Sequence, residues 1–377
     1  MPTALMYKKI LKSVVLSALV PVMLTGCSEN PLFFAGRYTG SGDPSGLYLF
    51  EMNRRNGDIR QVTEFNAGPN PSFFCLNRER KIGYLINEVN EYRGEKGGGL
   101  STFIYNPGKG IVVLAGEMLI PFGGPCYVSL TPDEDYLLIA NYQNASVLAV
   151  RLDEEKIPEV ISDTVLYQPG DSTLSHAHMI SYDPRGEFIY VTDLGTDRIL
   201  TYYFNGDSGR FDLINNGIAY LPDKSGPRHF IFNAEGTRMY VINELASTLS
   251  VFSREENGEL RLLQTCSTLP DDFKGTSYCA EICISDDGRF IYGSNRGHNS
   301  IVIFSAGIDG LLTLSGFVPC GGDWPRYFTT DPSGRYLLVG NQRSGDISVF
   351  RVNRRTGMLK GPVSKVNIPD VACMVFL

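Results

Sequence analysis

Imidazole, guanidinium and carboxylate side chains recur in this chain at short spacings that suit acid–base chemistry on an anion. His176 and His178 stand two residues apart, and Arg228 directly precedes His229, 16 residues before Glu244. An imidazole exchanges protons near neutral pH, and a guanidinium binds carboxylate or phosphate oxygens through paired N–H groups. An Arg–Glu pair can equally be a structural ion pair, and the spacing alone does not separate the two interpretations.

The pair His176 and His178 can also begin a metal site, because alternate residues of a strand point to one face. Zinc needs three or four ligands, and no third His or Cys follows at a suitable spacing. No Gly-x-Ser-x-Gly nucleophile motif precedes a helical pattern. The glycine run at 94–99 lacks the Lys-Ser/Thr ending of a phosphate loop. We therefore expect neither a metal nor a cofactor.

An internal repeat positions these residues. Six windows of 22 residues align without a gap, and each reads as an apolar run, a polar turn, a second apolar run and then Asn or Asp. The windows are 71–92, 125–146, 177–198, 227–248, 279–300 and 325–346. Their seventeenth residues are Asn87, Asn141, Asp193, Asn243, Asn295 and Asn341. We expect this side chain to cap the end of a strand; a ring of oxygen ligands for Ca²⁺ is the less favoured alternative.

Each window is followed by a third apolar run, usually a glycine turn, and a fourth run, as in 247–268. Four short antiparallel strands in roughly fifty residues are typical of a β-propeller blade. The run 33–41 matches a second strand without its first, and 370–377 matches a lone first strand. The sequence thus predicts an all-β, seven-bladed propeller closed by pairing of the two terminal strands, rather than two sandwiches in tandem.

The repeat also gathers polar residues at one rim of the ring. In the hairpin of the first two strands, we expect window position 2 beside position 18. Position 2 holds His178, Arg228 and Arg326; position 18 holds Glu88, Glu244 and Arg296, with Arg37 in the incomplete blade. His176, His229 and His298 fall close by, so all four histidines map to this rim. Such a concentration favours a functional site over scattered ion pairs.

Composition limits the partners. The chain has 377 residues, 43% of them hydrophobic, and a formal net charge of −7. These values are typical of a folded protein, and an acidic chain without a basic run argues against nucleic acid as a partner. We expect a monomer.

The first 26 residues read as an export signal. Lys8, Lys9 and Lys12 precede an apolar stretch at 13–23 that is too short to span a membrane. The string Leu-Thr-Gly-Cys that ends at Cys27 resembles the lipobox of bacterial lipoproteins, in which that cysteine carries the lipid. We predict a signal peptide at 1–26, a tether at 27–32 and one propeller domain at 33–377, held at the periplasmic or cell-surface side of a membrane. An ordinary signal peptide with a chance cysteine is the alternative.

Seven further cysteines follow Cys27. Four lie inside apolar runs and are expected in the core: Cys75, Cys126, Cys283 and Cys373. The other three, Cys266, Cys279 and Cys320, lie nearer loops. One disulfide among these three is compatible with an exported protein.

Four strings carry a resemblance to a known family. They are SHAHMISYDPRGEFIYVTDLGTDR (175–198), GPRHFIFNAEGTRMYVINELAST (226–248), AEICISDDGRFIYGSNRGHNSIVIF (280–304) and PRYFTTDPSGRYLLVGNQ (325–342). Together they resemble the lactonase family of seven-bladed propellers, which includes a propeller-type 6-phosphogluconolactonase and a carboxy-muconate lactonizing enzyme. The resemblance extends from about Phe33 to Leu377. It implies a site in the central channel built from His176, Arg228, Glu244 and Arg296, without a metal.

The resemblance further implies hydrolysis of a lactone, which is a cyclic ester. We expect His176 or Glu244 to act as the base, with Arg228 and Arg296 holding the anion and the developing oxyanion. The expected substrate contacts are His178, His229, Arg326, Arg37 and His298. The partner is then a small anionic sugar-acid lactone; 6-phosphogluconolactone itself is a cytoplasmic metabolite and does not match an exported chain. The alternatives are a cycloisomerase of the muconate-lactonizing type, a metal-dependent lactonase, and a non-catalytic propeller that binds a sugar acid or a protein.

Overall fold

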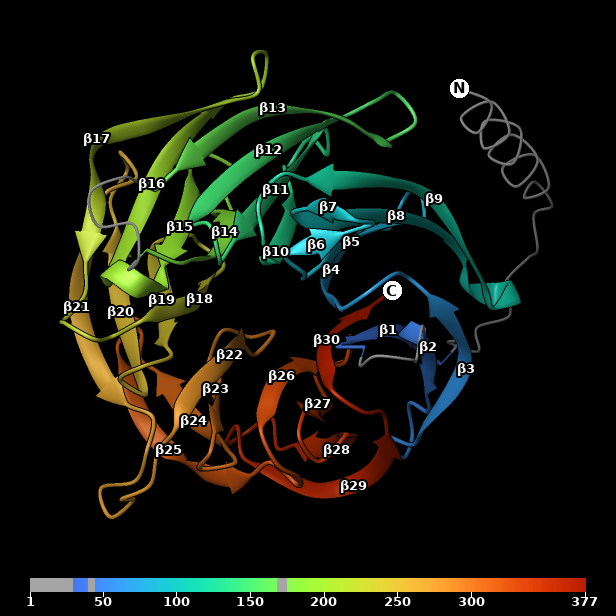
Figure 1. Cartoon of the computed structure of the whole chain (residues 1–377). Helices are drawn as coiled ribbons and strands as arrows, with labels where there is room; N and C mark the ends of the chain where they lie inside the picture. Colours follow the sequence, from blue (N-terminus) through green and yellow to red (C-terminus); the bar gives the residue numbers. More distant parts are fainter. Residues whose placement is uncertain (1–29, 40–44, 168–174) are drawn as a thin grey trace, which may run out of the picture. The chain divides into compact units, whose positions relative to one another are not determined.

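The computed structural model describes residues 30–39, 45–167 and 175–377. Within these residues, seven four-stranded sheets stand around a ring (Figure 1). The prediction of an all-β, seven-bladed propeller with four antiparallel strands per blade is confirmed. In the described part of the chain, no helix is long and apolar enough to cross a membrane. The predicted signal peptide at 1–26 and the lipidation site Cys27 lie outside the described residues.

The strands of each blade are counted outward from the centre of the ring. The first strands are β4 (Pro71–Asn77), β10 (Pro125–Leu130), β14 (Ala177–Tyr182), β18 (Pro227–Phe232), β22 (Tyr278–Ile284), β26 (Pro325–Thr330) and β30 (Val371–Phe376). The second strands are β5 (Ile82–Asn87), β11 (Tyr136–Asn141), β15 (Ile189–Asp193), β19 (Arg238–Asn243), β23 (Phe290–Arg296), β27 (Tyr336–Asn341) and β1 (Leu32–Arg37).

The third and fourth strands complete the blades. The third strands are β8 (Gly98–Asn106), β12 (Ser146–Leu152), β16 (Arg198–Asn205), β20 (Thr248–Arg254), β24 (Ser300–Ala306), β28 (Asp346–Val352) and β2 (Ser45–Met52). The fourth strands are β9 (Ile111–Ile120), β13 (Pro158–Leu166), β17 (Arg210–Tyr220), β21 (Leu260–Ser267), β25 (Leu312–Pro319), β29 (Leu359–Asn367) and β3 (Ile59–Asn66). The small elements are β6 (Glu91–Tyr92), β7 (Glu95–Lys96), η1 (Pro107–Lys109) and η2 (Leu194–Thr196).

Burial follows the place of a strand in its blade. Every residue of the second strand β11 is buried, whereas the fourth strand β3 alternates between partly buried and exposed residues over most of its length. Neighbouring blades cover both faces of the inner strands, so apolar residues run there without alternation. The outermost strands have one solvent-facing side and therefore show the period of two.

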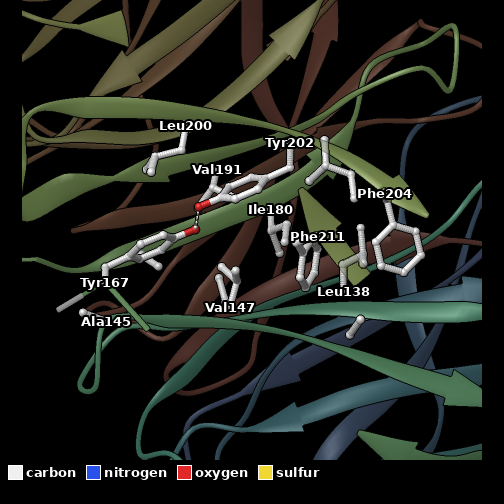
Figure 2. Close-up of a cluster of buried hydrophobic side chains, with 14 of the residues drawn as sticks. Leu138, Ala145, Val147, Tyr167, Ile180, Val191, Leu200, Tyr202, Phe204 and Phe211 are labelled. Carbon is white, nitrogen blue, oxygen red and sulfur yellow. Dashed lines mark hydrogen bonds between the residues drawn. The ribbon is translucent and has the colours of Figure 1, made fainter. Parts of the chain in front are cut away.

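Apolar side chains fill the spaces between adjacent blades. Figure 2 shows one such cluster, in which Leu138 packs with Ile180 and Val191 of the next blade. The hydroxyl of Tyr202 donates a hydrogen bond of 3.2 Å to that of Tyr167 in the same cluster. Removing one buried leucine from a contact of this kind costs about 2–5 kcal/mol. The blades therefore stabilise one another pairwise around the ring.

Tyrosines of the second strands link neighbouring blades at six of the seven junctions. Their hydroxyl groups donate to backbone carbonyls in the turn between the third and fourth strands of the following blade, at 2.7–3.0 Å. The pairs are Tyr84 with Lys156, Tyr136 with Gly206, Tyr190 with Gly258, Tyr240 with Gly310, Tyr292 with Gly357 and Tyr336 with Arg55. These bonds satisfy a phenolic hydroxyl at each crossing and fix the angle between neighbouring blades.

The Asn or Asp at the end of the second strand is buried and forms hydrogen bonds within its blade or to the segment that leads in from the preceding blade. Asn87 Nδ2 donates to the carbonyl of Ala67 at 2.9 Å. Asn243 Nδ2 donates to the hydroxyls of Thr248 and Ser250, both at 2.9 Å. The prediction of a cap at the strand end is confirmed, and these contacts hold the end of the second strand in place.

The two ends of the described chain close the ring. Strand β30 pairs antiparallel with β1, with Phe33 opposite Phe376 and Gly36 opposite Cys373. The last blade thus takes its first strand from the C-terminus and its other three from the N-terminal part, as the sequence predicts. Closure removes the unpaired edges that an open array of sheets would expose.

A β-bulge interrupts the pairing of the first two strands in every blade. Pro227 pairs with Asn243 and His229 with Ile242, so Arg228 has no residue directly opposite. The equivalent shifts fall at Ser72, Cys126, His178, Ala280–Glu281, Arg326 and Ala372. A bulge re-aims the side chains beside it, and in this ring it does so at the same point of all seven blades.

Candidate active site

The starts of the first strands and the ends of the second strands meet at one rim. Window positions 2 and 18 are not directly opposite each other in the strand pairing, although the side chains of Arg228 and Glu244 lie side by side as expected. Position 18 lies opposite the residue just before the first strand or at its start: Arg296 pairs with Tyr278, and the N–H of Glu244 donates to the carbonyl of Gly226 at 2.7 Å. Position 2 lies at the same strand end, so both sets of residues still gather at this rim.

Arg228, Glu244 and Arg296 form the central cluster of the rim. Glu244 Oε2 lies 3.1 Å from Arg228 Nε and 2.9 Å from Arg296 Nη2. The arginine side chains are only 4% and 7% exposed, and that of Glu244 is 20% exposed. Arg228 Nη1 donates to the carbonyl of Ala280 at 2.6 Å, and Arg296 Nη2 to that of Cys279 at 2.9 Å. The two guanidinium groups are therefore held rigidly by one carboxylate and by backbone carbonyls.

The cluster carries an excess of positive charge in a buried setting. Burial lowers the pKa of Arg296 to about 10, and the nearby charges of Arg228 and Arg326 lower it in the same direction, while Glu244 opposes them. Arg296 is still protonated at neutral pH. Two cations against one carboxylate leave a net positive charge that an anion would neutralise.

His176 lies at the same rim and has one nitrogen already committed. Its Nδ1 lies 2.9 Å from the carbonyl oxygen of Tyr142. Because a carbonyl only accepts, Nδ1 carries the proton of the neutral imidazole, which assigns the lone pair to Nε2. The ring stacks on that of Tyr142, with centroids 4.3 Å apart and an angle of 8° between the planes. Burial raises the pKa of the Tyr142 hydroxyl, and the charge of Glu244 acts in the same direction, while Arg228 and Arg296 lower it.

His178 and His229 lie deeper, with ring centroids 5.1 Å apart. Burial, followed by the charge of Arg228, lowers the pKa of His178 well below its ordinary value. Its Nδ1 is buried without a hydrogen-bond partner among the described residues. His229 Nδ1 donates to Glu281 Oε1 at 3.0 Å, and Glu281 partly offsets the burial that lowers the pKa of His229. In both imidazoles the lowered pKa favours the neutral form.

Arg326 belongs to a second charged group on the rim. The hydroxyl of Tyr38 donates to Glu88 Oε2 at 2.6 Å and accepts from Arg326 Nη2. The Arg326 guanidinium carbon lies 4.9 Å from the centre of the Tyr38 ring. Burial raises the pKa of Tyr38 far above its ordinary value, so this phenol stays protonated and links the arginine to the carboxylate.

Aromatic side chains of the first strands pack together beside these polar groups. Phe73 stacks on Tyr127 with centroids 4.2 Å apart, and it meets Tyr327 and His229 edge-on at 6.1 Å each. The four residues come from four different blades. These rings supply apolar surface next to the fixed polar groups, a combination that is typical of small-molecule sites.

Seven of the nine predicted site residues take part in these contacts: Arg326 in the second charged group, and His176, His178, Arg228, His229, Glu244 and Arg296 in and around the central cluster. The other two are His298 and Arg37, and Arg37 Nη1 donates to the carbonyl of Tyr38 at 3.2 Å. His298 packs on Phe273 at 4.7 Å and on Phe317 of the fourth strand β25 at 6.1 Å. Arg37 Nε donates to the carbonyl of Ser45 at 2.8 Å within its own blade. Their roles in substrate binding stay predictions.

The structure adds residues that the sequence analysis missed. Glu281 occupies window position 3, as His229 does, so examining that position in all windows would have revealed it. Tyr142 occupies window position 18, as Glu244 and Arg296 do, but it carries no charge and so does not stand out among them. Trp324 immediately precedes its window, as His176 does, and lies with its ring centre 5.5 Å from the guanidinium carbon of Arg296.

Cysteines and metal ligands add nothing to the site. The seven cysteines of the described chain are free, so the disulfide considered among Cys266, Cys279 and Cys320 is wrong. Cys279 and Cys320 are buried rather than near the surface. Within the described ranges, no group of three or more His, Cys, Asp and Glu side chains is arranged to hold a metal ion.

The chain is thus a seven-bladed propeller whose inner strands carry arginines, carboxylates and imidazoles close together at one rim. The family model described as "Lactonase, 7-bladed beta-propeller" matches residues 32–376. The chain belongs to this lactonase family, as the resemblance predicts.

Individual relatives agree with this assignment. The chain is 29% identical to a 6-phosphogluconolactonase of Bacillus subtilis strain 168 over 352 residues, which cover 91% of this chain and 97% of the relative. It is 32% identical to a 6-phosphogluconolactonase of Formosa agariphila over 337 residues, 87% of this chain and 94% of the relative. Among solved structures, the periplasmic gluconolactonase of Pseudomonas aeruginosa matches with a TM-score of 0.86 and 26% identity, over 92% of this chain and 99% of that chain.

Proposed function

We propose that this chain hydrolyses a sugar-acid lactone at the rim cluster. The observation that carries the proposal is the pair of guanidinium groups fixed on Glu244, 3.1 Å and 2.9 Å from one carboxylate oxygen. Fixed donors with excess positive charge are suited to an oxyanion, because they need no reorganisation as the charge develops. Relatives named for lactone hydrolysis support this chemistry over other uses of a propeller channel.

His176 is the better candidate for the base. The carboxylate of Glu244 is engaged by two guanidinium groups, so its contacts suit a positioning role. His176 donates from Nδ1 to the carbonyl of Tyr142, so its Nε2 is the nitrogen that can accept a proton. A backbone carbonyl that accepts a hydrogen bond from one ring nitrogen fixes the tautomer and the orientation of a functional imidazole.

The reaction then proceeds in two steps. Nε2 of His176 takes a proton from water as the water oxygen bonds to the lactone carbonyl carbon, and the carbonyl oxygen becomes an oxyanion beside Arg228 and Arg296. The bond from that carbon to the ring oxygen then breaks, and His176 returns its proton to the ring oxygen. The product is an open-chain hydroxy acid, whose carboxylate the arginines also bind. Glu244 acts as a positioning residue for both guanidinium groups.

A pH-indicator assay on a panel of sugar lactones tests the proposal. Arg228→Ala should lower turnover by about 10²-fold or more, the loss typical of an oxyanion donor. Arg238→Ala is the matched control in the same blade, because Arg238 lies at the other end of the second strand and donates to the carbonyl of Asp309. A wild-type rate in Arg228→Ala would remove Arg228 from the mechanism.

The panel also separates the other functions considered. Hydrolysis of no lactone, with a sugar acid raising the melting temperature, would replace the proposal with a non-catalytic binding protein. Ring closure of an unsaturated diacid would replace it with a cycloisomerase. Loss of activity with a chelator would point to a metal-dependent lactonase instead.

We further propose that the chain is an exported lipoprotein anchored through Cys27. The support is the sequence around that cysteine, described above. Incorporation of labelled fatty acid into the wild type, and its loss in Cys27→Ala, tests this. A wild-type protein that takes up no label would contradict it.

A further inference from the structure

Trp324 has a backbone conformation that is unusual for a bulky residue. The residue just before the first strand has a positive φ in five blades: Asn70 at 44°, Gly124 at 61°, Gly226 at 64°, Trp324 at 67° and Asp370 at 52°. Gly, Asn and Asp adopt this left-handed region readily, whereas a bulky side chain there is an outlier. The other four blades with this conformation have Gly, Asn or Asp at the position, and Trp324 differs from them in its bulky side chain.

Surrounding contacts hold Trp324 in this conformation. Its N–H donates to Asn299 Oδ1 at 2.9 Å, and its carbonyl accepts from the N–H of Gln342 at 2.9 Å. Asn299 Nδ2 also donates to Asp323 Oδ1 at 2.7 Å, which fixes the amide. Strained residues held in this way are frequent at binding sites. Trp324 is also the only tryptophan in the sequence.

The indole joins a buried arginine of the rim to an exposed one. The guanidinium carbon of Arg343 lies 3.3 Å from the ring centre, and that of Arg296 lies 5.5 Å away. Tyr278 contacts the same ring with centroids 6.2 Å apart. Arg343 follows the second strand β27, as Arg296 ends β23, so Arg343 lies at the same rim as the candidate active site.

Arg343 differs from the other rim arginines in its charge balance. Arg228 and Arg296 share Glu244, and Arg326 reaches Glu88 through Tyr38. Among the residues that the structure describes, Arg343 forms no ion pair with a carboxylate, and its side chain is exposed. A guanidinium lying flat on an aromatic ring keeps its N–H groups in its own plane, where they can grip a phosphate or carboxylate from the side.

We propose that Trp324 and Arg343 form an outer subsite that binds an anionic group, phosphate or carboxylate, at the end of the lactone remote from the scissile ester. This inference rests on the proposed lactone hydrolysis at the adjacent rim. Stacking on the indole limits the motion of Arg343, so little conformational freedom is lost when the anion binds. The subsite makes the chain select charged sugar lactones over neutral ones of the same ring.

The test compares lactones that differ in one charged group. Glucono-δ-lactone is the neutral substrate, its 6-phosphate adds a phosphate, and glucarolactone adds a carboxylate. Arg343→Gln should raise the KM for each charged lactone, relative to the KM for the neutral one, by about tenfold, the effect of one charge-assisted contact. Trp324→Gly, which installs the residue found in two other blades, should move this ratio in the same direction.

Arg351→Gln is the matched control. Arg351 lies in the same blade, is exposed, and has its guanidinium carbon 5.7 Å from the ring centre of Tyr336. Its substitution should leave the ratio unchanged. An equal change of KM for charged and neutral lactones in Arg343→Gln would overturn the inference, and so would a wild type that does not favour charged lactones.

A binding measurement separates failure of the subsite from failure of the proposed function. If the wild type hydrolyses none of the lactones, the proposed function is wrong. The fluorescence of Trp324, the single tryptophan, then reports binding of the hydrolysed acids. Tighter binding of 6-phosphogluconate than of gluconate, reduced about tenfold in Arg343→Gln, supports the subsite. Equal binding of the two acids, or no response to either, overturns it.

Discussion

Replacing Glu244 with Gln removes the carboxylate that Arg228 and Arg296 share, while keeping the size of the side chain. At an effective dielectric constant of about 20, unit charges about 3 Å apart attract by roughly 5 kcal/mol before desolvation is subtracted. Breaking a buried pair by removing one partner costs about 3–5 kcal/mol. Gln keeps one acceptor oxygen, so we expect a loss near the lower end, about 3 kcal/mol. With an unfolding entropy of about 2.1 cal/mol/K per residue, that loss lowers Tm by about 4 °C.

The pH dependence of this loss has a defined sign. Burial lowers the pKa of Arg296 to about 10, and Glu244 raises it, so Glu244→Gln lowers it further. A cation whose pKa is lower in the folded than in the unfolded protein destabilises the fold while it is charged in both states. This penalty declines as the pH rises through the folded pKa. The difference between variant and wild type should therefore be largest near pH 7 and smaller at pH 10.

Thermal unfolding followed by circular dichroism at the two pH values measures this difference. Glu235→Gln is the control, because Glu235 is an exposed residue of the same blade. Equal stability of Glu244→Gln and the wild type at pH 7 would refute the reasoning. A difference that grows toward pH 10 would refute it as well.

Three further predictions concern the base, the second charged group and the core. His176→Ala should lower kcat by about 10²–10³-fold in the indicator assay, as expected for a general base; a loss under about tenfold would exclude it from that role. Tyr38→Phe removes the hydroxyl between Arg326 and Glu88, and should lower the free energy of unfolding in urea by about 1–2 kcal/mol. An unchanged urea midpoint would contradict this. Leu138→Ala should lower the free energy of unfolding in urea by about 2–5 kcal/mol. A loss below about 1 kcal/mol would mean that the cluster in Figure 2 repacks.

The blades can be predicted from the sequence because one pattern is repeated. The apolar runs and the Asn or Asp at the strand ends recur at a regular spacing, so each window supports the assignment of the others. Ring closure follows from the same pattern, since 33–41 and 370–377 each match part of a window. Most predicted rim residues also come together for this reason.

Local backbone geometry limits the prediction of the site. The bulge that leaves Arg228 unpaired depends on how the first strand fits against its neighbours, and the residue pattern does not encode it. His298 follows Arg296 by two residues, yet Gly297 has φ at 97° and turns the chain, so the imidazole packs on Phe317 instead. Trp324 carries no charge that marks it in the sequence, whereas Glu281 shares window position 3 with His229 and could have been found by comparing the windows.

Strand β1 runs from Leu32 to Arg37 and then reaches Tyr38, which belongs to the rim. Leu32 therefore begins the strand at the opposite face of the ring, where its carbonyl accepts a hydrogen bond from the N–H of Leu377 at 3.0 Å. Both ends of the propeller leave from that face. Under the proposed lipidation of Cys27, five residues before Leu32, the anchored end of the chain would therefore enter the ring on the face opposite the arginine-lined rim.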